Sequence, residues 1–128
     1  MYLDSSAIAR LVLRDEPGSD ALRRQLAHQG NLVSSQIAVV EVLRTVRRRA
    51  AEREDRARRL LHRFSLVDLG REVIDLAITI RPMILRSLDA IHLASALLHR
   101  PNLQAFISYD RRQLEAARAL GLPALSPE

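Results

Sequence analysis

Residues 1–14 read Met-Tyr-Leu-Asp-Ser-Ser-Ala-Ile-Ala-Arg-Leu-Val-Leu-Arg. Tyr2-Leu3 is a short apolar run that predicts a brief strand, and the polar residues after it can cap a helix from Ala7 to about Arg14. Residues 104–121 show the same order: a strand over 104–108, an acid at Asp110, and a helix over 111–120 that Gly121 closes. A strand, an acid and a helix therefore follow one another near both ends of the chain.

Between these two units, short apolar runs alternate with longer helical patterns. Further strands are predicted at 32–33 and 66–69, with a short edge strand at 123–125. Further helices are predicted at about 19–28, 36–51, 53–64, 72–80 and 88–99, with Ser35 and Ser87 as N-caps. Such alternation favours right-handed crossovers and a parallel sheet covered on both faces. We therefore expect an α/β fold, with a short central parallel sheet of four to five strands, as one domain over residues 1–128.

Four acidic residues stand beside apolar runs: Asp4, Glu41, Asp89 and Asp110. Ligands of parallel sheets lie beyond the carboxyl ends of the strands. Asp4 and Asp110 directly follow predicted strands there, and the other two lie early in helices that start near the same rim. We expect these four carboxylates to converge on one site.

Convergence of carboxylates has an electrostatic cost. Two unit charges about 4 Å apart repel by roughly 4 kcal/mol at an effective dielectric near 20. Protons or cations must offset that repulsion, and carboxylate oxygens are suited to a hard divalent cation such as Mg²⁺. The acids therefore predict a metal site, conditional on the fold.

Each acid also has a purely structural explanation. Aspartate is a favoured N-cap, so capping is the simpler explanation of Asp4 or of Asp110 taken alone, although a cap can also serve a site. Asp89 lies where its charge meets a helix dipole favourably. Glu41 is flanked by valines, so a purely structural role is harder to assign to it. An ion pair with Arg44 is the structural explanation that competes with a functional one.

Other motifs give weaker evidence of a catalytic or metal-binding site. His92 lies one turn past Asp89, but its apolar neighbours favour a packing role. The chain has no His-x-x-x-His pair for zinc, no glycine-rich phosphate loop and no cysteine. Ser5 and Ser6 have no histidine base placed by a motif, which argues against serine-hydrolase chemistry.

Composition and charge limit the class of protein. The chain has 128 residues, of which 48% are hydrophobic, which excludes a mainly disordered protein. Apolar runs stay well below the roughly 20 residues that span a bilayer, and the N-terminus lacks a signal-peptide pattern, so we expect no membrane association and a cytoplasmic location.

The net charge is +5, and every basic residue is arginine, whose planar guanidinium suits phosphate. Many arginines crowd residues 44–63, where a solvated or partner-binding face is the simpler explanation. Arg86, Arg111 and Arg112 lie next to the acidic rim and are the better candidates for phosphate contact.

With these residues placed, the chain resembles the PIN-domain ribonucleases, in particular the VapC toxins of bacterial VapBC toxin–antitoxin pairs. The resemblance runs from end to end and rests on four blocks: Tyr-Leu-Asp-Ser-Ser-Ala from residue 2, Ser-Gln-Ile-Ala-Val-Val-Glu-Val around Glu41, Leu-Asp-Ala-Ile-His-Leu-Ala-Ser-Ala from residue 88, and Phe-Ile-Ser-Tyr-Asp-Arg-Arg-Gln-Leu from residue 106. It implies a three-layer α/β/α fold and a Mg²⁺- or Mn²⁺-dependent endoribonuclease.

The resemblance also implies roles for residues. Asp4 and Asp89 match direct metal ligands, Glu41 matches a third acid, and Asp110 matches a fourth that acts through water. Ser6 matches a hydroxyl that orients the first acid, and Ser108 has a supporting role. Water activated by the metal would attack the scissile phosphate. A VapB-type antitoxin, an RNA substrate and a homodimer are the implied partners.

Two other classes remain. A catalytically silent PIN-like module would bind RNA or protein without turnover, but such a module has no need of all four acids. A phosphoacceptor domain of the response-regulator kind would need a lysine near the C-terminal end, and this chain has none.

Overall fold

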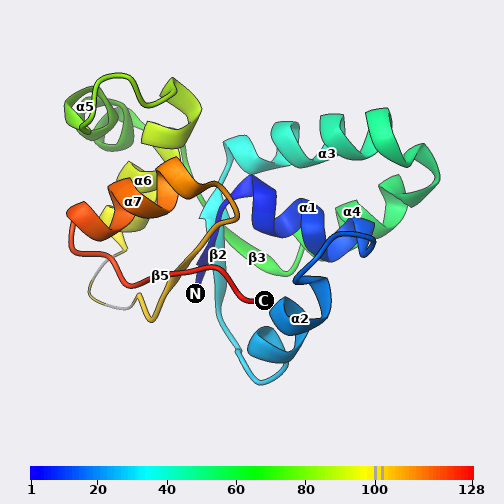
Figure 1. Ribbon diagram of the computed structural model, residues 1–128. Helices are drawn as coiled ribbons and strands as arrows, with labels where there is room; N and C mark the ends of the chain where they lie inside the picture. Colours follow the sequence, from blue (N-terminus) through cyan, green and yellow to red (C-terminus); the bar gives the residue numbers. More distant parts are fainter. Residues whose placement is uncertain (100, 102) are drawn as a thin grey trace.

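The computed structural model describes residues 1–99, 101 and 103–128. In chain order the elements are β1 (Tyr2–Leu3), α1 (Ser5–Leu13), α2 (Ser19–Leu26), β2 (Leu32–Ser35), α3 (Ile37–Arg49), the 3-10 turn η1 (Ala51–Arg53), α4 (Glu54–Leu61), β3 (Phe64–Val67), α5 (Arg71–Thr79), α6 (Ser87–Leu98), β4 (Phe106–Ile107), α7 (Arg111–Ala119) and β5 (Ala124–Leu125) (Figure 1). None of the helices in this described part is long and apolar enough to cross a membrane.

The strands form one sheet in the order β3-β2-β1-β4-β5. Neighbouring strands run parallel, and Tyr2 of the central strand pairs with Val33 on one side and Phe106 on the other. The last strand pairs with β4 at the edge, as predicted. The α/β class and the parallel sheet are confirmed, and the carboxyl ends of β1 and β4 lie side by side.

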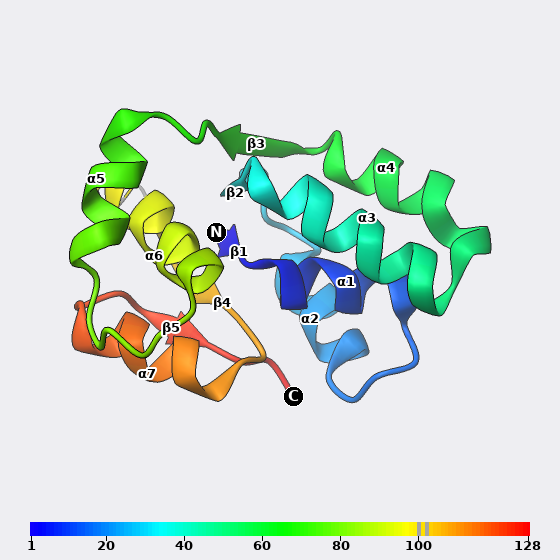
Figure 2. The same ribbon diagram turned by 90° about the horizontal axis from the view of Figure 1, so that it is seen from above.

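Helices cover both faces of the sheet (Figure 2). Successive side chains of a strand point to opposite faces, and even the two-residue strands follow this rule. Leu3 and Ile107 pack in one apolar cluster with residues of α1, α3 and α4. Tyr2 and Phe106 pack in the other cluster, with residues of α6 and α7. The result is the expected three-layer α/β/α arrangement.

Three local predictions were wrong. Ser35 is the last residue of β2 and not the cap of α3, whose cap position is held by Gln36. The third strand begins at Phe64 rather than Leu66, because Phe64 is buried and pairs with Leu32, whereas Leu69 is exposed beyond the strand end. Ser87 is the first residue of α6 rather than its cap; Arg86 holds the cap position and makes no side-chain capping bond.

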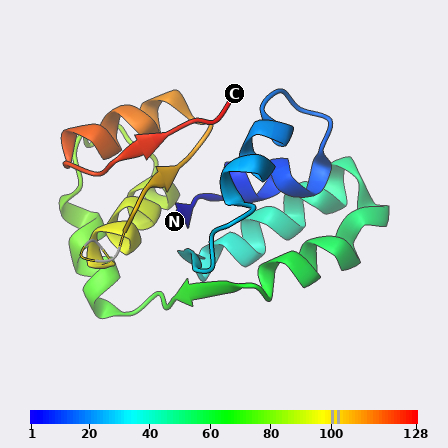
Figure 3. The same cartoon turned by 90° about the horizontal axis from the view of Figure 1, so that it is seen from below.

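The loop before α2 meets the C-terminal segment (Figure 3). Gly18 has φ +87°, and a Cβ there would lie 2.6 Å from the carbonyl oxygen of Pro127 and 3.1 Å from the Tyr109 ring. The Tyr109 hydroxyl donates to that same carbonyl over 2.8 Å, and Arg10 stacks 3.8 Å above the ring centroid. Both the backbone angle and the close approach require glycine here.

Candidate active site

Asp4 lies at the carboxyl end of β1, where it caps α1 and is 2% exposed. Its Oδ1 accepts hydrogen bonds from Ser6 Oγ at 2.6 Å and from the Ala7 amide at 3.0 Å. Its Oδ2 accepts from Ser108 Oγ at 2.5 Å. Burial raises the pKa of Asp4, against the nearby His92 and these donors, which lower it. Capping and a place in a polar site therefore coexist in one residue.

Ser108 ties the two central strands together at this rim. Beyond its bond to Asp4, its Oγ accepts from the Asp110 amide at 3.0 Å. The Ser6 hydroxyl accepts in the same way from the Tyr109 amide at 3.0 Å. The two hydroxyls thus connect Asp4 and the first turn of α1 with the loop after β4.

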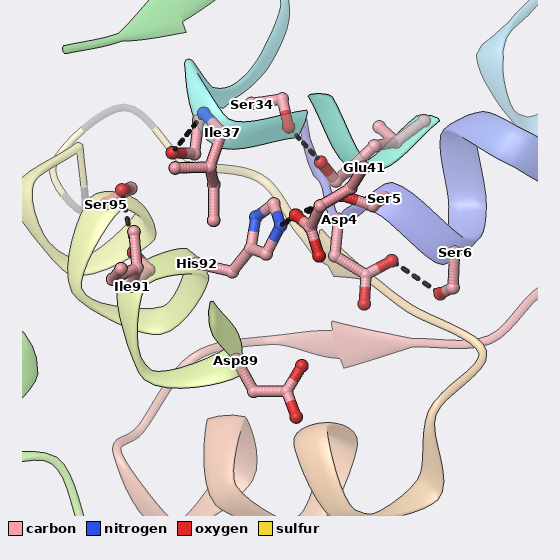
Figure 4. A network of polar contacts seen from close by, with 12 residues as sticks. Asp4, Ser5, Ser6, Ser34, Ile37, Glu41, Asp89, Ile91, His92 and Ser95 are labelled. Carbon is pink, nitrogen blue, oxygen red and sulfur yellow. Dashed lines mark hydrogen bonds and ion pairs between the residues drawn. The ribbon is translucent and has the colours of Figure 1, made fainter. Parts of the chain in front are cut away.

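Glu41 lies in the second turn of α3, partly exposed, and faces the same space as Asp4 (Figure 4). Its Oε1 accepts from Ser5 Oγ at 2.6 Å and pairs with His92 Nε2 at 2.8 Å. These partners, and not Arg44, are the ones that hold it. Burial alone would raise the pKa of Glu41, but His92 and Ser5 outweigh burial and lower it.

His92 is 1% exposed and does more than pack, which corrects the sequence interpretation. Its Nδ1 lies 2.7 Å from the Tyr2 hydroxyl, and its Nε2 lies 3.1 Å from Ser5 Oγ. Apolar neighbours in the sequence are typical both of a histidine that only packs and of a buried histidine that bonds to a functional group. Only the contacts in the folded protein distinguish these two roles.

Asp89 lies in the first turn of α6 and is half-buried. Its carboxylate is held on the Asp4 side of the site by Gln113, which no sequence argument singled out. With its amide oriented so that nitrogen faces the carboxylates, Gln113 donates to Asp4 Oδ2 at 2.9 Å and to Asp89 Oδ1 at 3.3 Å. Gln113 is 1% exposed, and its position inside the Tyr-Asp-Arg-Arg-Gln-Leu block was the available signal.

The charges of the four acids act on one another. Burial raises the pKa of Asp89, and the charges of Asp110, Asp4 and Glu41 raise it further. Asp110 itself is exposed and caps α7, accepting from the amides of Arg112 at 2.9 Å and Gln113 at 3.2 Å. The predicted acids therefore gather along one rim, with Asp110 at its solvent side.

The three rim arginines, Arg86, Arg111 and Arg112, are exposed. Arg86 directly precedes α6 and the other two begin α7, so they flank Asp89 and Asp110 in the chain. Arg111 also pairs with Glu115 at 3.4 Å, an exposed contact worth little. Their side chains remain available to a phosphate.

Among residues 1–99, 101 and 103–128, no three His, Asp or Glu side chains lie close enough to hold a metal ion as they stand. The donor set nevertheless suits a metal ion: hard carboxylate oxygens come from the ends of β1 and β4 and from α3 and α6, and a cation would relieve their mutual repulsion. Gln113 occupies the gap between Asp4 and Asp89, where its amide partly offsets that repulsion.

Comparison with known proteins decides the family. The model of the PIN domain matches residues 1–119. The chain belongs to the PIN-domain family. Two relatives come from Mycobacterium tuberculosis. Ribonuclease VapC46 is 42% identical over 99% of this chain and 97% of that protein, and Ribonuclease VapC47 is 39% identical over 99% of this chain and 96% of that protein.

Solved structures share the PIN fold. Mycobacterium tuberculosis VapC20, described as a sarcin–ricin loop cleaving toxin, superposes with a TM-score of 0.75 at 16% identity over 98% of each chain. A toxin–antitoxin complex from Klebsiella pneumoniae gives 0.74 at 21% identity over 99% of this chain and 97% of that one. At such identities these structures show the fold alone.

Proposed function

We propose that this chain is a metal-dependent endoribonuclease and the toxin of a type II toxin–antitoxin pair. The observation that carries the proposal is the rim of electrostatically linked acids around buried Asp4, in a chain 42% identical to a VapC ribonuclease. A rim of this kind is unfavourable in isolation and becomes favourable when a divalent cation binds.

Asp4, Asp89 and Glu41 would hold Mg²⁺ or Mn²⁺ directly, and Asp110 through water. Such an ion acts as a Lewis acid that lowers the pKa of water and neutralises charge on phosphate oxygens. Ser6 and Ser108 hold both oxygens of Asp4, so that carboxylate needs no reorientation. Gln113 would hold Asp4 and Asp89 apart until the ion replaces its contacts.

RNA would approach over the solvent side of the rim. An open hollow of about 530 Å³ adjoins Glu41 and Asp110, and Arg10, Arg49 and Arg111 contribute to its lining. Arg10 and Arg49 pair with Glu16 in this lining, so Arg111, with Arg86 and Arg112 nearby in the chain, would supply the phosphate contacts that keep a polyanion beside the acids. Cleavage should therefore weaken as salt rises.

Cleavage of RNA is tested by removing single charges. Asp4→Asn and Asp89→Asn should each abolish Mg²⁺- or Mn²⁺-dependent cleavage of a mixed RNA pool, because each removes a ligand charge. Asparagine caps helices as well as aspartate does, so α1 should persist. Asp75→Asn, at an exposed acid of α5, is the matched control and should cleave normally.

Two outcomes would count against the enzyme. Well-folded Asp4→Asn and Asp89→Asn proteins that still cleave with added metal would refute the ligand assignment. Wild-type protein that binds RNA without cutting it in either metal would favour the alternative, a catalytically silent PIN-like module.

An antitoxin of the VapB type is the proposed protein partner. A groove of about 480 Å³ lies between α1, α2 and α4, and none of the four acids lines it. Leucines and arginines line this groove, and the arginines are Arg14, Arg23, Arg56, Arg59 and Arg63. An amphipathic helix with acidic flanks complements such a surface, and we infer that the antitoxin supplies it.

A second copy of the chain is the proposed partner of another face. Apolar side chains of α5 and the loop before α6 are unusually exposed, with Ile78 at 69% and Ile84 at 82%. A hollow of about 280 Å³ lined by Ile74, Met83 and Ile91, among others, adjoins them. A protruding side chain beside a hollow is self-complementary, as a two-fold interface requires.

A further inference from the structure

The side chain of His92 bridges two residues from distant parts of the chain. Tyr2 lies 90 positions away on the central strand, and Glu41 lies 51 positions away on α3. The Tyr2 ring is fully buried and stacked on Phe106, with centroids 5.3 Å apart and planes 7° apart. The Tyr2 end of the bridge is therefore anchored in the core. The other end is the carboxylate of Glu41, which lies beside His92 in Figure 4.

The surroundings of each ring nitrogen indicate where the hydrogen lies. Nε2 faces Glu41 Oε1 at 2.8 Å and Ser5 Oγ at 3.1 Å. Ser5 donates its own hydrogen to Oε1, so its oxygen is an acceptor toward His92. Two acceptors require that Nε2 carries a hydrogen, since a bare nitrogen would be repelled by both.

Nδ1 has the opposite surroundings. It faces the Tyr2 hydroxyl at 2.7 Å. A phenol keeps its hydrogen at neutral pH, and burial raises the pKa of Tyr2 well above its usual value. The hydroxyl can therefore donate to a bare Nδ1. Together the two sets of contacts favour a hydrogen on Nε2 and a bare Nδ1.

We propose that Tyr2 and His92 are positioning residues for Glu41. Tyr2 holds His92 in its Nε2–H form. His92 and Ser5 then hold Oε1 of Glu41, which turns Oε2 toward the other acids. The role of the held carboxylate as a ligand rests on the proposed function, whereas the hydrogen-bond chain does not. Fixing Glu41 in advance saves the rotamer entropy that a free glutamate would lose on binding an ion.

The tautomer is measured directly. In metal-free protein near neutral pH, the ¹⁵N shifts of the His92 ring should show a protonated Nε2 and a bare Nδ1. In Tyr2→Phe the phenyl ring still stacks on Phe106, but the Nδ1 shift should move because its donor is gone. A hydrogen on Nδ1 in the wild type, or unchanged shifts in Tyr2→Phe, would overturn the proposed Tyr2–His92–Glu41 hydrogen-bond chain.

Positioning is measured by comparing two His92 variants. His92→Phe fills the space without a donor, whereas His92→Gln keeps an N–H near the place of Nε2. We expect His92→Phe to bind Mn²⁺ roughly tenfold more weakly and to lower kcat for RNA more than it raises KM. His92→Gln should recover most of both, which a merely structural role would not predict.

The controls separate the possible failures. Thermal melting shows whether His92→Phe is folded; if it is not, Tyr2→Phe serves in the same Mn²⁺ and kinetic assays. A folded His92→Phe that binds Mn²⁺ and cleaves like the wild type would refute the positioning role. Wild-type protein that neither binds Mn²⁺ nor cleaves RNA would instead refute the proposed function. The ring shifts would still test the Tyr2–His92–Glu41 hydrogen-bond chain.

Discussion

Asp89 shows how a single side chain is affected by the whole rim. Burial raises its pKa, and Asp110, Asp4 and Glu41 raise it further. The folded state thus holds the Asp89 proton more tightly than the unfolded chain, whose value is near 3.8. Its contribution to stability is fully present below that value and is lost as pH rises through the higher folded-state pKa. At neutral pH the metal-free protein therefore bears this repulsion.

Asp89→Asn should stabilise the metal-free protein at pH 7 while abolishing cleavage. Removing one charge relieves the repulsion, by on the order of 0.5 kcal/mol after solvent screening, or roughly 2–4 °C in melting temperature. The gain should disappear near pH 3, where the wild-type carboxyl is protonated. Differential scanning calorimetry with a chelator at both pH values measures it, and a lower melting temperature for the variant at pH 7 would contradict the account.

Residues differ in how far the sequence predicts their place. Asp4 and Asp110 follow strands, so the rule that parallel strands end at one rim was enough to bring them together. Gln113 and His92 could not be placed in this way. Their partners come from other helices and strands, and which helix faces meet depends on packing that local patterns do not encode.

At the scale of an element, α7 depends on its first residue. Asp110 accepts from the amides of Arg112 and Gln113, and Gln113 in turn reaches Asp4 and Asp89. The Asp110 cap therefore fixes the first turn of α7, which carries the Gln113 amide between Asp4 and Asp89. The predicted helix and its cap were confirmed because both signals are local in the sequence.

Two substitutions separate the cap from the charge. Asp110→Ala should cost about 1 kcal/mol of unfolding free energy, because it leaves two amides without their acceptor. Asp110→Asn should keep nearly full stability, since asparagine caps as well, yet should reduce cleavage. Urea unfolding and the RNA assay measure the two effects. Equal stability losses in both variants would show that the charge, and not the cap, stabilises α7.

At the scale of the molecule, the three proposed surfaces lie on different elements. The acids lie at the carboxyl ends of the strands, the arginine-lined groove on α1, α2 and α4, and the apolar face on α5 and the next loop. The sequence analysis identified the arginine-rich segment but neither of the two docking surfaces, because an exposed and a buried apolar residue look alike in a short amphipathic helix.

The proposed dimer is tested by placing charge on the apolar face. Ile78→Asp combined with Ile84→Asp should convert a dimer into a monomer, because a two-fold contact brings each new carboxylate to the interface twice. Leu125→Asp, at a similarly apolar exposed site on β5, is the control. Sedimentation velocity measures the state. A wild-type protein that stays monomeric at high concentration would end the proposal.

The arginine-lined groove proposed for the antitoxin is tested by reversing its charge. Arg59→Glu with Arg63→Glu should weaken binding of the cognate antitoxin at least tenfold, since an acidic helix would then meet like charge. RNA cleavage by the free toxin should be unchanged. Calorimetric titration of the antitoxin measures the loss, and undiminished affinity would place the antitoxin elsewhere.

Gly18 links a surface turn to the chemistry of the rim. Any larger residue there would press on Pro127 and on Tyr109, whose amide is bonded to Ser6, itself a partner of Asp4. Variation at this remote position would therefore be transmitted through three neighbours to the most buried acid. In a laboratory selection for weaker activity, the recovered substitutions should include this glycine, although it lines none of the surfaces proposed for RNA, metal or antitoxin.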